Sequence, residues 1–540
     1  MWQYPVMSMQ RDFTTDQAVQ RTASEYDRTP YRSLPYPLTR PAHVAAIGRT
    51  LGLALPAVTT ARTLEIGCAG GGNIIPLAAA FPDARFVGID LSPVQIGQAR
   101  ARAGAAGLAN IEFREGSVTG IDEGWGMFDY IVCHGVYSWV PAEVRRAILR
   151  VAAGRLSDRG AALVSYNVLP GWHLRRVARD AMLAHADQFD DPAERLAQAR
   201  AFLEFLKEHT PEDTPYGQVV RREATILADQ SDDYVMHEFL ETENNPCTVV
   251  EFVAEAAAAG LGHLGDSEYH ALPPGSRGPE TAARLRELAT TPIQLEQYVD
   301  LVIGRTFRQS ILMKPAAVAQ ARRGLGSSSM AELHVAARFV DVPEVNGPGP
   351  FVFKSPARRA PNAFRTLTTD SPVIARALAA LGSRWPSTAT PQELVAAACS
   401  GGTPCETAAP AVLDSLFRLM TAGMLQLSTV PVCAGRGDAI RPLGWFLARV
   451  DASRGAAGTA SLHHAPVPLD GPSRTLLPLL DGTRDRAALV QCVLDLMAEG
   501  SIVLQRDGEA VADPDMTRTA VTELVDTTIA KLASAALLSA

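Results

Sequence analysis

Short apolar segments alternate with helical segments between residues 60 and 167, and no other feature of this 540-residue chain constrains its fold as strongly. The segments between the apolar stretches carry apolar residues at helical spacing. Strands and helices that alternate in this way form a parallel sheet with helices on both faces. The expected strands are TLEI (63–66), RFVGID (85–90), IEFREG (111–116), FDYIVCH (128–134) and AALVSYN (161–167).

A glycine cluster, LEIGCAGGGN (64–73), follows the first expected strand. Glu65 lies just before this turn, and Asp90 ends the second strand, where a carboxylate accepts hydrogen bonds from ribose hydroxyls. Glycine lets the main chain approach a ligand that a Cβ atom would hold away, which is the role expected for Gly67, Gly70, Gly71 and Gly72. The turn therefore predicts a nucleotide-like ligand, and by itself it fits both NAD and S-adenosylmethionine.

Three features favour S-adenosylmethionine over a nicotinamide dinucleotide. The acid before the turn gives E-x-G-x-A-x-G, the common form in class I methyltransferases, with Ala69 at a position where many of them have glycine. The third strand ends in EGS, where adenine contacts lie in such enzymes. The fourth runs into CHGVYSWVP, a polar and aromatic loop at the carboxyl ends of the strands, where open α/β sheets bind ligands.

The expected site has a donor side and an acceptor side. Donor contacts are predicted for Tyr31, Glu65, Gly67, Gly71, Asn73, Asp90, Leu91, Ser117, Val118, Cys133 and Gly135. Ser117 stands where an aspartate often contacts the adenine amino group. Catalytic or acceptor-side roles are predicted for His134, Tyr137, Trp139 and Asn167, with Trp172 and His173 on the opposite wall. A hydrogen-bonded structural histidine at 134 and a core tryptophan at 139 are the alternatives.

The remaining chain falls into further segments. Tyr26, Tyr31 and Tyr36 belong to a proline-interrupted leader, which is expected to be either a lid over the donor or a strap on the surface. Residues 175–305 are expected to be mostly helical. FRQSILMK (307–314) and AELHVAARFVDV (331–342) are expected to complete the sheet, and NGPGP (346–350) is a linker.

An internal repeat follows the linker. Residues 371–400 resemble residues 471–500, each with a helix, a polar turn and a second helix. Together with the hairpin SIVLQRDGEAV, this pattern predicts two tandem winged-helix-like modules. Winged helices often bind DNA, but this region balances acidic and basic residues and has no basic run, so nucleic acid is not the expected partner.

Composition excludes other classes. A formal net charge of −8 favours neither nucleic acid nor anionic membranes, and no apolar run reaches the length of a transmembrane helix. The seven cysteines form no CxxC pair and are expected to be unpaired thiols in a reducing compartment. No metal motif is present, and His463–His464 is expected at the surface. We expect a cytoplasmic, bacterial protein without membrane insertion or metal.

Longer stretches resemble a particular family. YDRTPYRSLPYPLTRPAHVAAIGRTLGL, the glycine-turn region, FDYIVCHGVYSWVPAEV and SYNVLPGWHLRRVARD resemble class I methyltransferases with a methyltransferase regulatory domain. DDYVMHEFLETENNPCTVVEF is similar to the regulatory segment, and LLPLLDGTRDRAALV to the C-terminal module. The resemblance implies a core, a dimerising segment, and middle and C-terminal domains. Rickettsial relatives methylate lysines of outer-membrane proteins, which makes protein lysine methylation a candidate.

The expected architecture is a Rossmann-like α/β core with a helical insertion and α+β winged-helix-like C-terminal domains. The expected boundaries are a leader (1–45), a donor-binding core (46–175), a regulatory or dimerising insertion with the last core strands (176–345), and two modules (351–430 and 438–540). Three functions stay open. The acceptor is a protein lysine, which predicts a wide groove beside the C-terminal domains, or a small molecule or peptide, which predicts a pocket roofed by the insertion. The third is a non-catalytic donor-binding regulator.

Overall fold

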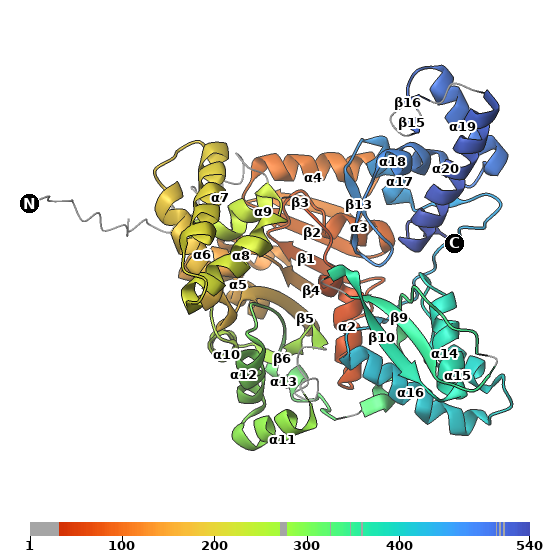
Figure 1. Ribbon diagram of the computed structural model, residues 1–540. Coiled ribbons are helices and arrows are strands. Elements are labelled where there is room, and N and C mark those ends of the chain that lie inside the picture. The colour runs from red at the N-terminus through yellow and green to blue at the C-terminus, as the bar shows by residue number, and fades with distance from the viewer. Residues whose placement is uncertain are drawn as a thin grey trace, which may run out of the picture.

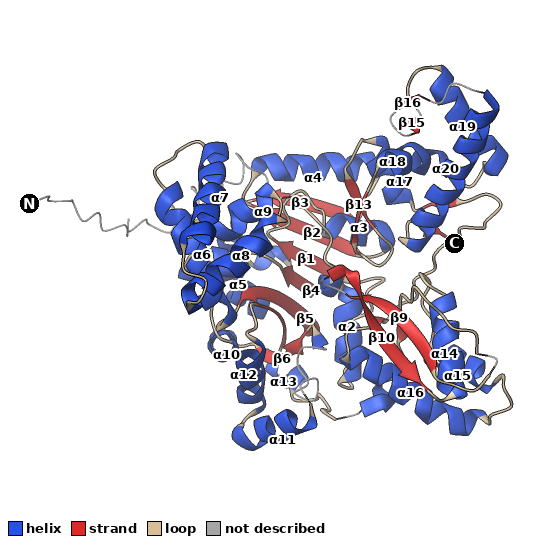
Figure 2. Cartoon of the chain, viewed as in Figure 1, coloured by secondary structure: helices blue, strands red, loops and turns tan. Residues whose placement is uncertain are grey.

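The computed structural model describes residues 32–269, 278–324, 326–345, 347–357, 360–503, 505–506, 509–510 and 514–540. A central sheet lies between a helical region on one side and two compact modules on the other (Figures 1 and 2). We call residues 351–430 the middle module and residues 438–540 the C-terminal module. Tyr26 and Tyr31 lie outside the described residues.

The central sheet has seven strands in the order β3-β2-β1-β4-β5-β7-β6. The first five strands in this order are parallel, whereas β7 runs antiparallel to both β5 and β6. All five strands expected in the amino-terminal half are confirmed, and the Rossmann-like core is therefore present. Their bounds are β1 Arg62–Ile66, β2 Arg85–Asp90, β3 Ile111–Glu115, β4 Phe128–Cys133 and β5 Leu156–Asn167.

Of the two strands predicted to complete the sheet, one is confirmed and the other prediction is wrong. FRQSILMK forms β7 (Phe307–Met313), as predicted. The segment at 331–342 contributes only β8 (His334–Ala336), which pairs with β11 (Gln426–Ser428) outside the central sheet. The edge strand is instead β6 (Gly262–Asp266), within the region expected to be helical. This five-residue GHLGD segment has little strand propensity of its own, so its pairing with β7 sets its conformation.

Helices cover both faces of the sheet. Successive side chains of a strand point to opposite faces, and along β2 Phe86 packs on one side while Val87 packs on the other. The first face carries α2 (Pro41–Thr50), α3 (Ile74–Ala80) and α4 (Pro93–Ala105). The second carries α5 (Ala142–Arg155) and α10 (Val249–Ala258). Glu65 pairs across the sheet with Gly88 and Val132, which places it on the first face.

A helical insertion follows β5 and has an apolar core of its own. It comprises α6 (Gly171–Ala186), α7 (Pro192–His209), α8 (Pro215–Ala228) and α9 (Asp232–Phe239). Met182, Leu203, Val220 and Val235 are buried together inside it. Next along the chain, α11 (Pro279–Leu288) and α12 (Pro292–Ile303) lie between β6 and β7. The insertion is the yellow group beside the sheet in Figure 1.

The two modules repeat the same succession of elements. In the middle module, α14 (Pro372–Ser383), α15 (Pro391–Cys399) and α16 (Cys405–Thr421) lead into β11. In the C-terminal module, α18 (Gly471–Leu476), α19 (Arg486–Ala498) and α20 (Pro514–Ser534) lead into β17 (Leu538–Ser539). The sequence pattern missed the long hairpin of β9 (Phe351–Ala357) and β10 (Ala360–Thr369). The short hairpin of β15 (Gln505–Arg506) and β16 (Glu509–Ala510) lies where a hairpin was expected.

Both modules pack on the first face of the core. The apolar core of the middle module continues into α2, where Ile47 shares a cluster with Leu378 and Leu416. The C-terminal module packs on α3 and α4, where Ile75 and Ala99 share a cluster with Leu477. Such continuous apolar packing, rather than a linker, fixes the modules relative to the sheet.

An ion pair reinforces the junction between α4 and the C-terminal module. Arg102 Nε and a terminal guanidinium nitrogen donate to the two carboxylate oxygens of Asp451, in α17 (Phe446–Ser453), at 2.9 and 2.7 Å. Thr459 donates a further hydrogen bond to Asp451 at 2.7 Å. The side chain of Asp451 is only 3% exposed and that of Arg102 19%, so water screens this bidentate pair weakly.

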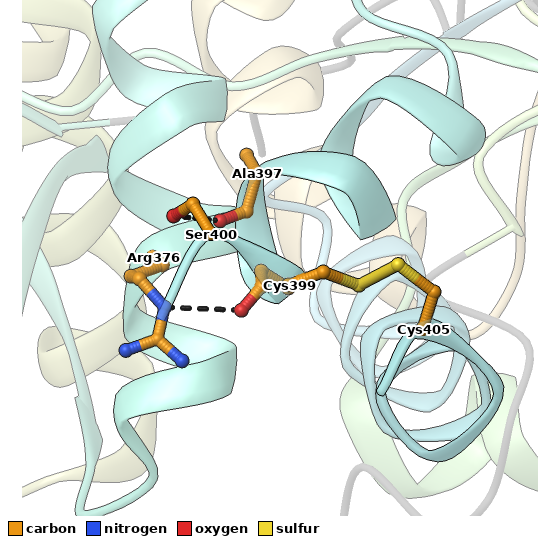
Figure 3. Close-up of a disulfide and its surroundings, with 6 residues drawn as sticks. Arg376, Ala397, Cys399, Ser400 and Cys405 are labelled. Atoms are coloured by element: carbon orange, nitrogen blue, oxygen red, sulfur yellow. Dashed lines mark hydrogen bonds between the residues drawn. A yellow bond between two sulfur atoms is a disulfide. The ribbon is translucent and has the colours of Figure 1, made fainter. Parts of the chain in front are cut away.

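Two cysteines are paired, contrary to the prediction of unpaired thiols. Cys399 and Cys405 form a disulfide across the turn between α15 and α16, with Cα atoms 5.5 Å apart (Figure 3). Beside this turn, Arg376 of α14 donates through Nε to the Ala398 carbonyl at the end of α15, at 3.0 Å. The spacing of the cysteines could not reveal this pair, because a helix end and the next helix start must first be brought together. Among the described residues, no helix has the length and hydropathy needed to cross a bilayer.

Asp451→Ala tests the junction. The substitution leaves the Arg102 guanidinium partly buried without a carboxylate, and loss of one partner of a buried pair costs about 3 kcal/mol or more. We expect a clear fall in the midpoint of thermal unfolding, measured by calorimetry. Asp414→Ala is the control, because it breaks an exposed pair with Arg418 within α16 and should cost about 0.5 kcal/mol. Equal effects of the two substitutions would contradict this account of the junction.

Candidate active site

A partly open cavity of about 570 Å³ lies at the carboxyl ends of the parallel strands. The turns after β1, β2 and β4 line one half of it, and α6, α9 and the start of β7 line the other. The leader contributes Ser33, Leu34 and Tyr36 to the wall. Of the donor contacts predicted from sequence, the cavity is lined by Glu65, Gly67, Asn73, Asp90, Leu91, Ser117, Val118 and Gly135.

The glycine turn serves the leader as well as a ligand. The amide of Gly72 donates to the Ser33 hydroxyl at 2.6 Å, and a Cβ atom on Gly72 would lie 2.2 Å from the Ser33 carbonyl oxygen. Gly67 has φ +74°, and its Cβ would meet Val136 at 2.4 Å. The prediction that every glycine of the turn makes room for a ligand is therefore wrong for Gly72, whose missing side chain admits the leader.

Two predicted donor contacts lie behind the cavity wall. Gly71 has φ +74° and would place a Cβ 2.7 Å from Ile75, so its role is to shape the turn. Cys133 is fully buried within β4, and burial raises the pKa of its thiol well above the usual range. Neither residue is part of the lining, and Tyr31 lies outside the described residues.

Glu65 presents a carboxylate oxygen without a partner to the donor half of the cavity. Its side chain is buried, and Asn73 donates a hydrogen bond to its Oε1 at 2.7 Å. Its Oε2 has no hydrogen-bond partner among the described residues. Burial, with a smaller contribution from the charge of Asp90, raises the pKa of Glu65 to about 8 although the Asn73 bond opposes the shift. A cationic ligand group would favour the ionised form of this carboxyl.

Asp90 holds the turn after β1 against the turn after β2. Its Oδ2 accepts from the amide of Ala69 at 2.8 Å, and its Oδ1 accepts from the amide of Ser92 at 3.0 Å. Ala69 has φ +46°, a left-handed conformation that is costly for a residue with a Cβ, and the Asp90 bond helps to keep it there. Asp90 ends β2, the position at which a carboxylate accepts hydrogen bonds from ribose hydroxyls in such sheets.

Gln95 was not predicted from the sequence, yet it lines the cavity near the expected adenine end. It is buried, and both its amide oxygen and its amide nitrogen lack partners among the described residues. The N-cap Ser92 accepts from its backbone amide at 3.1 Å and thereby sets the first turn of α4. Its position one turn after Asp90 is the signal that could have revealed it.

These groups fit S-adenosylmethionine. Glu65 Oε2 would hold the ammonium group, Asp90 the ribose, and Ser117, Val118 and Gln95 the adenine end. The orphaned polar atoms of Glu65 and Gln95 would each gain a partner, as buried polar groups require. When bound, this donor supplies a methyl group on a sulfonium, so the protein mainly has to align an acceptor with it.

His134 lines the cavity and is a poor candidate for a base. Burial lowers its pKa to about 4, so the ring is neutral at physiological pH. Its Nδ1 has no hydrogen-bond partner among the described residues, so the alternative of a hydrogen-bonded structural histidine does not fit this atom either. Its ring packs against Tyr36 of the leader, with centroids 4.0 Å apart. His134 therefore joins the leader to the cavity wall.

Tyr137 does not reach the cavity, contrary to its predicted acceptor role. Its ring is fully buried against Phe252, with centroids 5.3 Å apart, and its hydroxyl donates to the carboxylate of Glu255 in α10. The aromatic residue of the loop points into the core because α10 supplies that carboxylate. The polar loop alone could not show this direction, since α10 lies more than a hundred residues further along the chain.

The acceptor half of the cavity has aromatic and amide walls. Trp139 lines it with an edge-to-face contact to Trp172, whose ring centroid lies 6.0 Å away. Asn167 also lines it, and the Asn167 side chain donates to Asn244 at 3.3 Å. Trp172 is brought in by α6, as expected, whereas His173 is exposed on the outside of that helix. The structure thus brings together Trp139, Trp172 and Asn167.

Sequence reasoning missed the charged groups that the insertion brings to this half. Glu238 of α9 lines the cavity, and burial raises the pKa of its carboxyl to about 7, against the lowering effects of Arg175 and His237. No group in the described part of the chain donates a hydrogen bond to its carboxylate. Arg175 of α6 donates to the hydroxyl of Tyr234 at 3.1 Å. DDYVMHEF belongs to the stretch that resembles the regulatory segment, and its helical spacing puts Tyr234 and Glu238 on one side.

His463 and His464 are buried, so the prediction of a surface pair is wrong. His464 Nε2 lies 2.8 Å from Asn73 Oδ1, and His463 Nε2 lies 2.6 Å from the Pro386 carbonyl oxygen. Burial lowers the pKa of His464 to about 3, so its ring is neutral. Their partners are far away in sequence, and the residues around the pair gave no sign of them.

Three family models match separate parts of the chain. A methyltransferase domain matches residues 64–162, and a predicted methyltransferase regulatory domain matches residues 231–314. The model described as "PKMT, C-terminal winged helix domain" matches residues 441–537. The chain is 32% identical to the uncharacterized protein RP789 of Rickettsia prowazekii over 531 residues, which are 95% of this chain and 93% of RP789. The chain belongs to the same family, that of class I methyltransferases with this regulatory domain.

Solved structures agree over almost the whole length. PKMT2 from Rickettsia typhi is 26% identical and has a TM-score of 0.83, with 94% of this chain and 100% of PKMT2 covered. PKMT2 in complex with AdoHcy is 25% identical and has a TM-score of 0.84, with the same coverage. The protein is therefore an S-adenosylmethionine-dependent methyltransferase with a Rossmann-like core and a C-terminal winged helix.

Donor-site binding should release a proton. At pH 7 Glu65 is mostly protonated because its pKa is about 8, and a bound ammonium group favours the ionised form. We expect S-adenosylhomocysteine binding at pH 7 to release close to one proton, and its affinity to rise with pH until about pH 8. Calorimetry in buffers of different ionisation enthalpy measures the release. Glu65→Gln should abolish it, and wild-type binding without proton release would contradict the assignment.

Proposed function

We propose that this methyltransferase modifies a lysine side chain of a protein. The carboxylate of Glu238 in the acceptor half of the cavity carries the proposal, because it offers a partner to a cationic amine. The match to the "PKMT, C-terminal winged helix domain" and the similarity to PKMT2 also support it, since PKMT abbreviates protein lysine methyltransferase. The aromatic walls from Trp139 and Trp172 suit the apolar stem of a lysine.

Glu238 can also accept the proton that an amine must lose before it attacks. A lysine amine has an ordinary pKa of about 10.4, which burial in an apolar cavity lowers. A carboxyl with a pKa of about 7 is closer to such an amine than an exposed glutamate, so proton transfer costs less. The positive charge of Arg175 in α6 favours the ionised form of Glu238 and so limits the rise of its pKa. Arg175 also donates a hydrogen bond to the hydroxyl of Tyr234.

A small-molecule or peptide acceptor is the second candidate, and one observation favours it. The cavity is lined by α6 and α9 of the insertion, the arrangement expected for a small acceptor, whereas the middle module packs on α2 and the C-terminal module on α3 and α4. A lysine acceptor has to enter by its side-chain end alone. The same cavity would admit a free amine of similar width, so the two candidates differ in what carries the amine.

Transfer of label separates the two candidates. The full-length protein is incubated with methyl-labelled S-adenosylmethionine and a bacterial lysate, and protein and low-mass fractions are counted separately. We expect label in protein bands, and in methyllysine after total hydrolysis. The Glu238→Gln variant is assayed beside the wild type and should incorporate less label into protein at neutral pH. Label confined to the low-mass fraction would overturn the lysine proposal and leave the methyltransferase activity intact.

The pH profile tests the role of Glu238. Below its pKa of about 7 the carboxyl is protonated and neutral, and above it the carboxyl can pair with a cationic amine. We expect kcat/KM for the acceptor to rise as the pH passes from 6 to 8, and Glu238→Gln to lower it at least tenfold and to flatten that rise. Asp233→Asn is the control, because Asp233 lies in the same helix but outside the cavity lining. An unchanged profile in Glu238→Gln would refute the role.

A homodimer and a cytoplasmic location stay predictions. The side chains of Phe205 in α7 and Tyr216 in α8 are 50% and 48% exposed, and large exposed aromatic residues often mark protein contacts. They support self-association through the insertion.

A further inference from the structure

A hairpin of the C-terminal module reaches the donor site. Its strands are β13 (Gly458–Ala460) and β14 (Pro466–Pro468), and its turn carries His463 and His464. The amide of His464 donates to the Ser461 carbonyl at 2.8 Å, and His464 has φ +60°. A left-handed histidine is uncommon and is kept only where the surroundings hold it. The hairpin enters beside α3 in Figure 1.

His464 hydrogen-bonds to an atom that two residues of the leader also contact. The backbone amide of Tyr36 donates to Asn73 Oδ1 at 2.9 Å, and the Thr39 hydroxyl lies 3.1 Å from it. Because Tyr36 N–H can only donate, the atom facing it is the amide oxygen of Asn73. The neutral His464 ring must therefore donate through its Nε2–H.

The amide nitrogen of Asn73 holds the carboxylate of Glu65, which lines the methyl-donor half of the cavity. With the oxygen fixed, the amide nitrogen of Asn73 faces Glu65 and donates to Oε1 at 2.7 Å. Oε2 of Glu65 is then the oxygen without a hydrogen-bond partner among the described residues, and Glu65 lines the cavity. The sequence of contacts thus runs from His464 through Asn73 to Glu65 and ends at the cavity.

The neighbouring histidine provides the contrast. His463 is equally buried, but its Nε2 lies against the Pro386 carbonyl, and its ring stacks on Trp385 at a centroid distance of 4.9 Å. It therefore joins the C-terminal module to the middle module, and among the described residues it makes no hydrogen bond to Asn73 or Glu65. Two adjacent residues of one turn serve two different junctions.

We propose that His464 is a positioning residue for the methyl donor, through which the C-terminal module completes the donor site. The winged helix is then part of the methyltransferase's binding machinery, besides any contact it makes with an acceptor. The Asn73 amide has to hold one orientation for Glu65 to present a free oxygen. In the flipped orientation the Asn73 NH2 group would face the Tyr36 N–H, and the Nε2–H of His464 adds a second hydrogen bond that favours the observed orientation.

Substitutions at the two histidines test the proposal in the full-length protein. His464→Leu keeps the bulk of the ring and removes the N–H donor, and His464→Gln restores an N–H donor. His463→Leu is the matched control for burial and module packing. Each variant is checked by circular dichroism and thermal unfolding, and its Kd for S-adenosylhomocysteine is measured by calorimetry. The probe needs no acceptor, so the result is independent of the lysine proposal.

The expected pattern is specific to the hydrogen bond. His464→Leu should weaken S-adenosylhomocysteine binding about three- to tenfold, the usual effect of one lost hydrogen bond. His464→Gln should recover most of that loss. His463→Leu should lower thermal stability but keep the Kd within about twofold of wild type. Asn73→Ala should weaken binding too, and adding His464→Leu to it should have no further effect.

Two results would overturn the proposal. One is a folded His464→Leu variant with wild-type affinity for S-adenosylhomocysteine. The other is an equal loss of affinity in His464→Leu and His463→Leu, because that would assign the effect to general packing of the module.

Discussion

The orientation of one buried amide, that of Asn73, is the constraint on which the site depends. Its oxygen faces the backbone of the leader and the C-terminal hairpin, and its nitrogen faces Glu65. An amide can satisfy donors on one side and an acceptor on the other in only one of its two orientations. Three segments that are distant in sequence thus fix one orientation of this amide, and in that orientation Glu65 Oε2 is the carboxylate oxygen without a partner among the described residues.

The contact between the C-terminal hairpin and Asn73 lies on the face that carries α2, α3 and α4, on which both modules pack. Asn73 begins α3, so a hairpin that contacts it has to lie on that face, where Ile75 and Leu477 share a core and Arg102 pairs with Asp451. The acceptor half of the cavity remains on the side of the insertion. The C-terminal hairpin therefore contacts Asn73 on the donor side, whereas α6 and α9 line the acceptor half of the cavity.

The sequence predicted those parts of the molecule that local patterns determine. Five strands were located by their apolar runs, and Glu65 and Asp90 by their positions at strand ends, because parallel strands bring their carboxyl ends to one edge. Glu238 and His464 could not be found in this way. Their importance depends on which helix or hairpin reaches the cavity, and His464 meets a partner 391 residues away. The predicted role of Tyr137 was wrong for the same reason, because its hydroxyl donates to Glu255 in the distant helix α10.

The protonation states of two carboxyls, those of Glu65 and Glu238, determine the charge of the cavity when the methyl donor and the acceptor bind. Glu65 and Glu238 lie in opposite halves of one cavity, and burial raises the pKa of each, to about 8 and about 7. Ionisation of Glu65 offsets the net positive charge of the donor, so binding with release of one proton leaves the net charge of the cavity unchanged. The positive charge that would then face the other half is the sulfonium, and a nearby positive charge favours the neutral form of an amine. If the acceptor is a lysine, as proposed, Glu238 is the carboxyl in that half that could take its proton.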